Sequence, residues 1–226
     1  MKKLNYEVLK ENGYKGYVLK DAPEKVLQFG EGNFMRAFVD YFVDVMNEKA
    51  GFNGKVVLVQ PIRNVEGGFR LNDRINEQEG LYTLFLRGFQ DGKKVNDKRV
   101  ISSVSRCLNA YEDYEEVMKC AENPELRFIL CNTTEAGIQY DPSCKKDDCP
   151  PSSFPAKLTQ VLYHRYQAGK KGIIMLACEL IDNNGKELLK CVNQYIEQWG
   201  LEDGFKPSVA LLLTVSYRDA SVMRKR

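Results

Sequence analysis

The sequence predicts an α/β fold: a Rossmann-type, doubly wound and mostly parallel sheet with helices on both faces and a β-hairpin insertion. Three observations indicate this fold. Short, continuously apolar segments alternate with amphipathic helical ones, as strands buried on both faces require. The first apolar segment ends in Gly30-x-Gly32 and passes straight into a helix. The length of 226 residues is sufficient for a substantial core.

The predicted elements follow one another as strand–helix units. Strands are predicted at 25–29, 55–60, 127–131 and 172–177, and helices at about 33–49, 111–121, 155–168 and 185–199. The residues that share one face of the first helix, and are expected in the core, are Phe34, Phe38, Phe42 and Val45. Segments 81–89 and 101–104 are β-like, and Gln90-Asp-Gly-Lys93 between them is typical of a hairpin turn. This hairpin is the predicted insertion.

Composition and charge narrow the class of protein. The net charge is +2, from 33 basic and 31 acidic residues, which gives no electrostatic reason to expect nucleic acid or an anionic membrane. No apolar stretch approaches the roughly 20 residues of a membrane span. Seven cysteines occur without an apolar export signal, and we expect them to be reduced thiols. A cytoplasmic protein is predicted.

The glycine turn has the chemistry of a dinucleotide site. Gly30 permits a tight strand-to-helix turn, and Gly32 places no side chain between the backbone and a pyrophosphate. The helix that begins near Asn33 offers N–H groups and the positive end of its dipole. Met35 holds the place of the usual third glycine, so these residues alone suit an ordinary strand-to-helix turn equally well.

Four segments, in order, resemble the mannitol dehydrogenase family of long-chain polyol and uronate oxidoreductases. They are Phe29-Gly-Glu-Gly-Asn-Phe-Met-Arg-Ala37, Phe128-Ile-Leu-Cys-Asn-Thr-Thr-Glu-Ala-Gly137, the segment 155–163, and Cys178-Glu-Leu-Ile-Asp-Asn-Asn-Gly185. The family carries Gly-x-Gly-Asn-Phe-x-Arg-Ala at the first of them, so a missing third glycine is expected. The residues at 132–137 and 178–181 are most similar to those of the branch that interconverts tagaturonate and altronate.

The resemblance implies an NAD-dependent enzyme that transfers a hydride between the nicotinamide and a secondary alcohol carbon, without a metal. Its partner is a small sugar acid or polyol, with no nucleic acid and no membrane. Thr133, Thr134 and Glu135 follow a buried strand, at the edge where α/β sheets bind ligands. The residues expected to bind the cofactor are Phe29, Gly30, Gly32, Asn33, Phe34, Arg36, Thr133, Thr134 and Glu135.

The chain departs from the family in its catalytic residues. The family motif Lys-x-x-x-x-Asn-x-x-His is absent, and no catalytic residue is assigned. We therefore expect an NAD-binding domain at 1–205 and an atypical tail at 206–226, where the family's helical catalytic domain would begin. Two alternatives stay open: another polyol or mannonate dehydrogenase of the family, or a dinucleotide-binding fragment without turnover.

Several residues carry weaker expectations. The second strand is followed by Gln60-Pro-Ile-Arg63, with Glu66 later, in place of the acidic residue that usually binds the ribose of NAD. Arg63 would suit a 2′-phosphate, so the preference for NAD rests on the resemblance. Leu180 stands where polyol members carry an asparagine. His164, the single histidine, is expected to be a partly exposed helix residue, and Cys144 and Cys149 unpaired loop thiols.

Overall fold

The computed structural model describes residues 3–134, 136–205 and 212–214. Its main sheet has six strands in the order β5-β2-β1-β6-β7-β8, and every neighbouring pair is parallel. The strands are β1 (Glu24–Phe29), β2 (Lys55–Gln60), β5 (Val104–Asn109), β6 (Phe128–Cys131), β7 (Ile174–Ala177) and β8 (Leu212–Thr214). This order, with β1 at the centre, is that of a Rossmann fold and confirms the predicted class.

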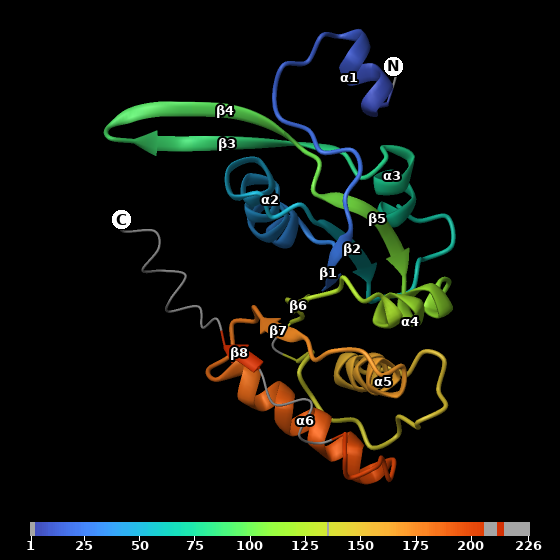
Figure 1. Ribbon diagram of the computed structural model, residues 1–226. Helices are drawn as coiled ribbons and strands as arrows, with labels where there is room; N and C mark the ends of the chain where they lie inside the picture. The colour runs from blue at the N-terminus through green and yellow to red at the C-terminus, as the bar shows by residue number, and fades with distance from the viewer. Residues whose placement is uncertain (1–2, 135, 206–211, 215–226) are drawn as a thin grey trace.

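Helices cover both faces of the sheet, as predicted. Alternate residues of β1 point to opposite sides: Val26 packs with α2, whereas Leu27 and Phe29 pack with the helices of the other face. The helix on the first side is α2 (Asn33–Ala50), with the short α3 (Leu71–Glu77) beside it. The other side carries α4 (Tyr114–Glu122), α5 (Phe154–Gln167) and α6 (Asn184–Gln198), which lie together in Figure 1. The sequence did not predict α3 or the N-terminal α1 (Tyr6–Glu11).

The predicted core face of α2 was wrong for Phe34 and Phe42, whereas Phe38 is partly buried and packs against the core. Phe34 and Phe42 are 50% and 43% exposed, and their rings pack on Phe38 between them, with centroid distances of 5.4 and 4.9 Å. The apolar residues that α2 buries against the sheet are Met35, Val39 and Val43. These sets have the same four-residue spacing and are offset by one residue, about 100° around the helix. Periodicity alone therefore did not distinguish the aromatic stripe from the buried one.

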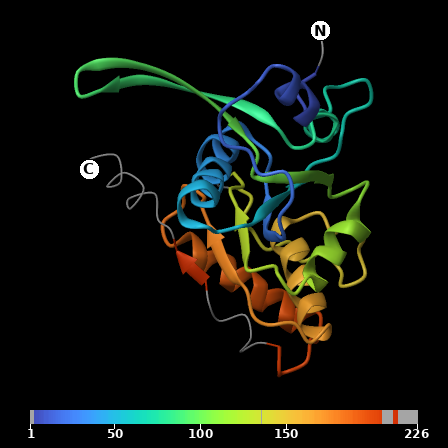
Figure 2. The same ribbon diagram turned by 45° about the horizontal axis from the view of Figure 1, so that its top comes forward.

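The hairpin is present, with its two strands β3 (Tyr82–Gln90) and β4 (Lys93–Ile101) extending away from the sheet in Figures 1 and 2. Its turn has positive φ at Asp91 and Gly92, as the sequence suggested. The single strand predicted at 101–104 was wrong, because this stretch contains the end of β4, two serines and the start of β5. Ser102 and Ser103 bond Asp44 and the carbonyl of Asp40, which holds the chain where it turns from the hairpin into the sheet.

Two further findings concern the helices and the C-terminal segment. Within the described ranges, no helix combines the length and apolar character that crossing a bilayer requires. Of the segment assigned to an atypical tail, residues 212–214 form β8 beside β7. The remainder of that segment lies outside the described residues.

Candidate functional site

A cavity of about 810 Å³ lies at the carboxyl edge of the sheet. It is bounded by the turn after β1, the end of β2, the loop after β6 and the first turn of α5. β1 has β2 on one side and β6 on the other, which makes it the point where the strand order reverses. Ligands of open α/β sheets bind in the crevice outside the strand ends at this point. The fold therefore favours this cavity as a ligand site.

The two glycines of the turn have different structural requirements. Gly30 has a φ of 118°, which side-chain-bearing residues rarely adopt, so the turn itself requires glycine there. Gly32 has φ −63° and ψ 166°, which any residue adopts, and a Cβ at this position would meet nothing within 4 Å. The fold does not require a glycine at position 32. Its missing side chain instead leaves clearance in the wall of the cavity.

Two side chains fix the orientation of the peptide groups in this turn. Gln28 Nε2 donates to the carbonyl of Gly30 at 3.0 Å, and Arg36 Nε donates to that of Glu31 at 2.9 Å. In a trans peptide the N–H points opposite to the carbonyl, so the N–H groups of Glu31 and Gly32 point away from these side chains. Helix α2 begins at the next residue, and no side chain caps its N-terminus. The Glu31 N–H is engaged by its own carboxylate. The Gly32 N–H and the helix dipole favour an anion.

A buried polar network lies beneath the turn. Asp40 is fully buried, and burial raises the pKa of its carboxyl to about 7 despite the opposing effects of Tyr82 and Arg36. The Tyr82 hydroxyl lies 3.3 Å from Asp40 Oδ2 and donates to the Arg36 carbonyl at 2.7 Å. Asp40 Oδ1 and Gln28 Oε1 are both buried acceptors without a partner among the described residues, although the two side chains are in contact. Gln28 also opposes the rise of the Asp40 pKa. Below this pKa of about 7 the carboxyl carries a proton, which Asp40 Oδ1 can donate to Gln28 Oε1.

A buried lysine forms part of the opposite wall. Lys157, on the first turn of α5, is 1% exposed and lines the cavity. Its ammonium donates to the Ser152 carbonyl at 2.8 Å and lies 3.5 Å from the Tyr111 hydroxyl. Burial lowers its pKa to about 8. No carboxylate of the described residues pairs with it, and a buried cation without a counterion attracts an anionic ligand.

A buried carboxylate holds the loop after β6. Glu179 follows β7, is fully buried, and accepts a hydrogen bond from the Thr133 N–H at 3.0 Å. Its Oε2 atom has no hydrogen-bond partner among the described residues. The contact ties the ends of β6 and β7 together and fixes Thr133 at the cavity. Burial and the charge of Glu179 raise the pKa of the Cys131 thiol well above its usual value.

The residues predicted to bind a cofactor separate into three groups. Those that line the cavity are Phe29, Gly30, Gly32, Thr133 and Thr134. Asn33, Phe34 and Arg36 do not line it: Arg36 braces the turn and donates to Asn33 Oδ1 at 2.6 Å, and the ring of Phe34 stacks on that of Phe38. Glu135 lies outside the described residues.

Sequence reasoning missed four residues of this region, namely Glu31, Asp40, Lys157 and Glu179. Three of them lie inside the segments that resemble the family or directly beside the glycine turn. Their importance depends on burial and on partners far away in the chain, which periodicity does not show.

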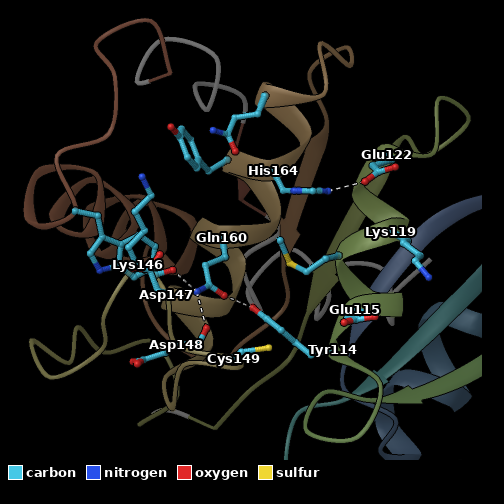
Figure 3. Close-up of a pocket in the computed structure, with 14 residues that line it drawn as sticks. Tyr114, Glu115, Lys119, Glu122, Lys146, Asp147, Asp148, Cys149, Gln160 and His164 are labelled. Atoms are coloured by element: carbon cyan, nitrogen blue, oxygen red, sulfur yellow. Dashed lines mark hydrogen bonds and ion pairs between the residues drawn. The ribbon is translucent and has the colours of Figure 1, made fainter.

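A second pocket, of about 420 Å³, lies between α4, α5 and the loop at 145–149 (Figure 3). Several of its polar groups pair with one another. His164 Nε2 lies 2.8 Å from Glu122 Oε1, and Gln160 Nε2 donates to the carbonyls of Lys146 and Asp148 at 2.7 and 2.9 Å. None of the residues that line it belongs to a strand end. This pocket therefore lacks the features that favour a dinucleotide.

The structure also places the single histidine and the two loop cysteines considered in the sequence. His164 lies on α5 with 35% of its side chain exposed, in agreement with its prediction as a partly exposed helix residue. Cys144 and Cys149 are free thiols in the loop before α5; Cys144 is buried and Cys149 exposed. In the part of the chain that the structure describes, no group of three or more His, Cys, Asp or Glu side chains is placed to hold a metal ion.

Comparison with known proteins identifies the family. The family model described as the mannitol dehydrogenase Rossmann domain matches residues 24–206. The chain belongs to the mannitol dehydrogenase family. Altronate oxidoreductase of Phocaeicola vulgatus is 51% identical over 188 residues, which cover 81% of this chain and 38% of that protein. Altronate oxidoreductase of Bacillus subtilis is 47% identical over 209 residues, which cover 91% of this chain and 41% of that protein.

Two solved structures share the fold of this chain. Mannitol 2-dehydrogenase of Pseudomonas fluorescens, in a ternary complex with NAD and D-mannitol, matches with a TM-score of 0.76 at 22% identity, covering 93% of this chain and 45% of that one. A substrate-free D-sorbitol dehydrogenase matches with a TM-score of 0.72 at 19% identity, covering 98% and 50%. At these identities the likeness concerns the fold alone. The chain spans about two fifths of the length of the curated relatives it matches.

Proposed function

We propose that this chain is the cofactor-binding half of an NAD-dependent oxidoreductase that interconverts tagaturonate and altronate in the cytoplasm. Residues 1–205 constitute the NAD-binding domain in this proposal. The substrate follows from the names of the relatives at 45–51% identity, all altronate oxidoreductases. The bound nicotinamide supplies or accepts the hydride, and the described residues bind and orient the dinucleotide.

The observation that carries the proposal is the clearance at Gly32. Its backbone conformation suits any residue and its surroundings are open, so the glycine serves a group outside the protein rather than the fold. That clearance lies beside the Gly32 N–H, which points away from Arg36, and the N-terminus of α2. A pyrophosphate matches this arrangement, because it is anionic and requires close approach to the backbone.

The walls of the cavity suit the remainder of a dinucleotide. Lys157 offers an unpaired positive charge opposite the glycine turn. Thr133, held by Glu179, and the adjacent Thr134 follow the end of β6, on the side of the sheet where the nicotinamide half lies in this fold. The cavity volume of about 810 Å³ is within the range of cofactor sites.

Calorimetric titration with NADH tests the proposal, using the purified chain and the variant Gly32→Asp. The open surroundings of Gly32 predict that the variant folds, so a change in binding reports on the ligand site. Saturable binding by the chain, abolished in the variant by the added carboxylate, supports the proposal. Equal binding by both proteins, or no binding by the folded chain, would contradict it.

A chimeric enzyme tests the proposed reaction. Replacing the matching segment of the Bacillus subtilis altronate oxidoreductase with this chain is expected to preserve NADH-dependent reduction of tagaturonate. Loss of that activity in a folded chimera would favour the alternative of a dinucleotide-binding fragment without turnover.

A further inference from the structure

The ribose end of the cavity lacks the acidic residue that commonly selects NAD. In Rossmann domains that prefer NAD, a carboxylate at the end of the second strand accepts hydrogen bonds from the adenosine ribose. Here β2 ends at Gln60, whose amide is already bonded to the Ile62 carbonyl and to Asn64 at 3.1 and 2.9 Å. Glu66, the first acidic residue after β2, is exposed and does not line the cavity. Among the described residues, no carboxylate at the end of β2 is therefore placed to bind the ribose.

A different carboxylate lines the cavity close to this position. Glu31 lies between the two glycines of the turn, and its side chain is partly buried in the cavity wall together with Pro61 and Ile62. Pro61 and Ile62 directly follow β2, so this part of the wall lies on the β2 side of the turn, which is the adenosine side of the crevice. The charge of Glu31 also acts on the thiol of Cys107 in β5, the strand beyond β2.

We propose that Glu31 accepts hydrogen bonds from the adenosine ribose hydroxyls and selects NAD over NADP, in place of the acidic residue missing from the end of β2. This inference rests on the proposed binding of a dinucleotide in the same cavity. A carboxylate in contact with the ribose forms charge-assisted hydrogen bonds with its hydroxyls and repels a 2′-phosphate.

The neighbouring charges agree with this role. The Arg36 guanidinium donates hydrogen bonds to the Glu31 carbonyl and to Asn33 Oδ1, and so stabilises the turn. Arg63 stacks on the Tyr111 ring, 4.2 Å from its centroid, and does not line the cavity. Burial raises the pKa of the Glu31 carboxyl, and a hydrogen bond from its own backbone N–H and the charge of Arg36 oppose this shift. Glu31 is thus the acidic group of the turn that a ligand in the cavity meets.

The test is calorimetric titration with NADH and with NADPH of the full chain and of Glu31→Gln. The substitution keeps the shape of the side chain and removes its charge. We expect it to weaken NADH binding about tenfold, the loss of a charge-assisted hydrogen bond, and to raise the affinity for NADPH relative to NADH by at least as much. Glu66→Gln, which removes the same charge from the exposed loop after β2, is the matched control and is expected to change neither affinity.

Glu31→Asp provides a second variant, since it keeps the charge and is expected to retain discrimination against NADPH. The inference is overturned if Glu31→Gln leaves both affinities unchanged, or if Glu66→Gln carries the effect. Failure of the wild-type chain to bind NADH would overturn the proposed function, and this inference with it. The wild-type titration therefore distinguishes failure of the site from failure of the role of Glu31.

Discussion

The raised pKa of Asp40 predicts that Asp40→Asn stabilises the protein at alkaline pH relative to the wild type. In the folded chain the carboxyl is 0% exposed, and its pKa is raised from 3.8 to about 7 by burial. The folded state therefore keeps a proton that the unfolded state has released at any pH between these two values. Stability from this group is fully present below pH 3.8 and is lost as the pH rises through about 7.

The magnitude follows from the size of the shift. Each pH unit in the window removes about 1.4 kcal/mol of unfolding free energy. Between pH 5 and pH 8, only the two units up to about pH 7 contribute, so the wild type loses about 3 kcal/mol at this site. Asparagine at position 40 carries an N–H₂ donor for Gln28 Oε1 and an acceptor for the Tyr82 hydroxyl, and does not titrate. It therefore reproduces the neutral carboxyl at every pH.

Urea unfolding of both proteins at pH 5 and pH 8 measures this effect. The stability of Asp40→Asn relative to wild type is expected to increase by about 3 kcal/mol between the two pH values. Asp44→Asn is the matched control on the same helix: Asp44 is buried but ion-paired, accepting from Arg99 Nε at 2.7 Å and from the Ser102 N–H at 2.8 Å. It is expected to destabilise by about 3 kcal/mol at both pH values. A difference between Asp40→Asn and wild type that is independent of pH would refute the reasoning.

Two further predictions concern the walls of the cavity. Lys157→Met removes a buried charge that no carboxylate of the described residues compensates, and it leaves the Ser152 carbonyl without its donor. The expected net result is a gain of about 1–2 kcal/mol in the free energy of unfolding, measured by heat or urea, together with weaker NADH binding by calorimetry. Weaker binding without added stability would show that the charge is already compensated. Gly30→Ala places a side chain at φ 118° and is expected to destabilise the protein by at least about 1 kcal/mol. Gly32→Ala, in an ordinary conformation with open surroundings, is expected to have a free energy of unfolding within about 0.5 kcal/mol of wild type in the same assay. Equal losses in the two alanine variants would contradict the distinction between a conformational glycine and a clearance glycine.

The sequence predicted the parts of the fold that depend on local pattern. Continuously apolar runs identified β1, β2, β6 and β7 because parallel strands are buried on both faces, and the glycine turn followed from its position between strand and helix. The buried face of α2 was missed because an aromatic stripe and an aliphatic stripe share one spacing. The boundary between β4 and β5 was missed because Ser102 and Ser103 interrupt the ladder through bonds to α2, which lies far away in the chain.

The candidate site could be predicted only in part for the same reason. Gly30, Gly32 and Thr133 stand at strand ends, where the fold itself places ligands, so their positions followed from the order of the elements. The unpaired charge of Lys157 and the burial of Asp40 and Glu179 arise from contacts between segments distant in the sequence. No local pattern reports whether a charged residue has a partner.

The most direct test of the central claim is a crystal structure of this chain with NADH. We expect the pyrophosphate at the Gly32 N–H and the N-terminus of α2, with the dinucleotide crossing the carboxyl edge of β2, β1 and β6. Density for the dinucleotide in the pocket between α4 and α5, or at the carboxyl edge with its pyrophosphate away from the glycine turn, would contradict it.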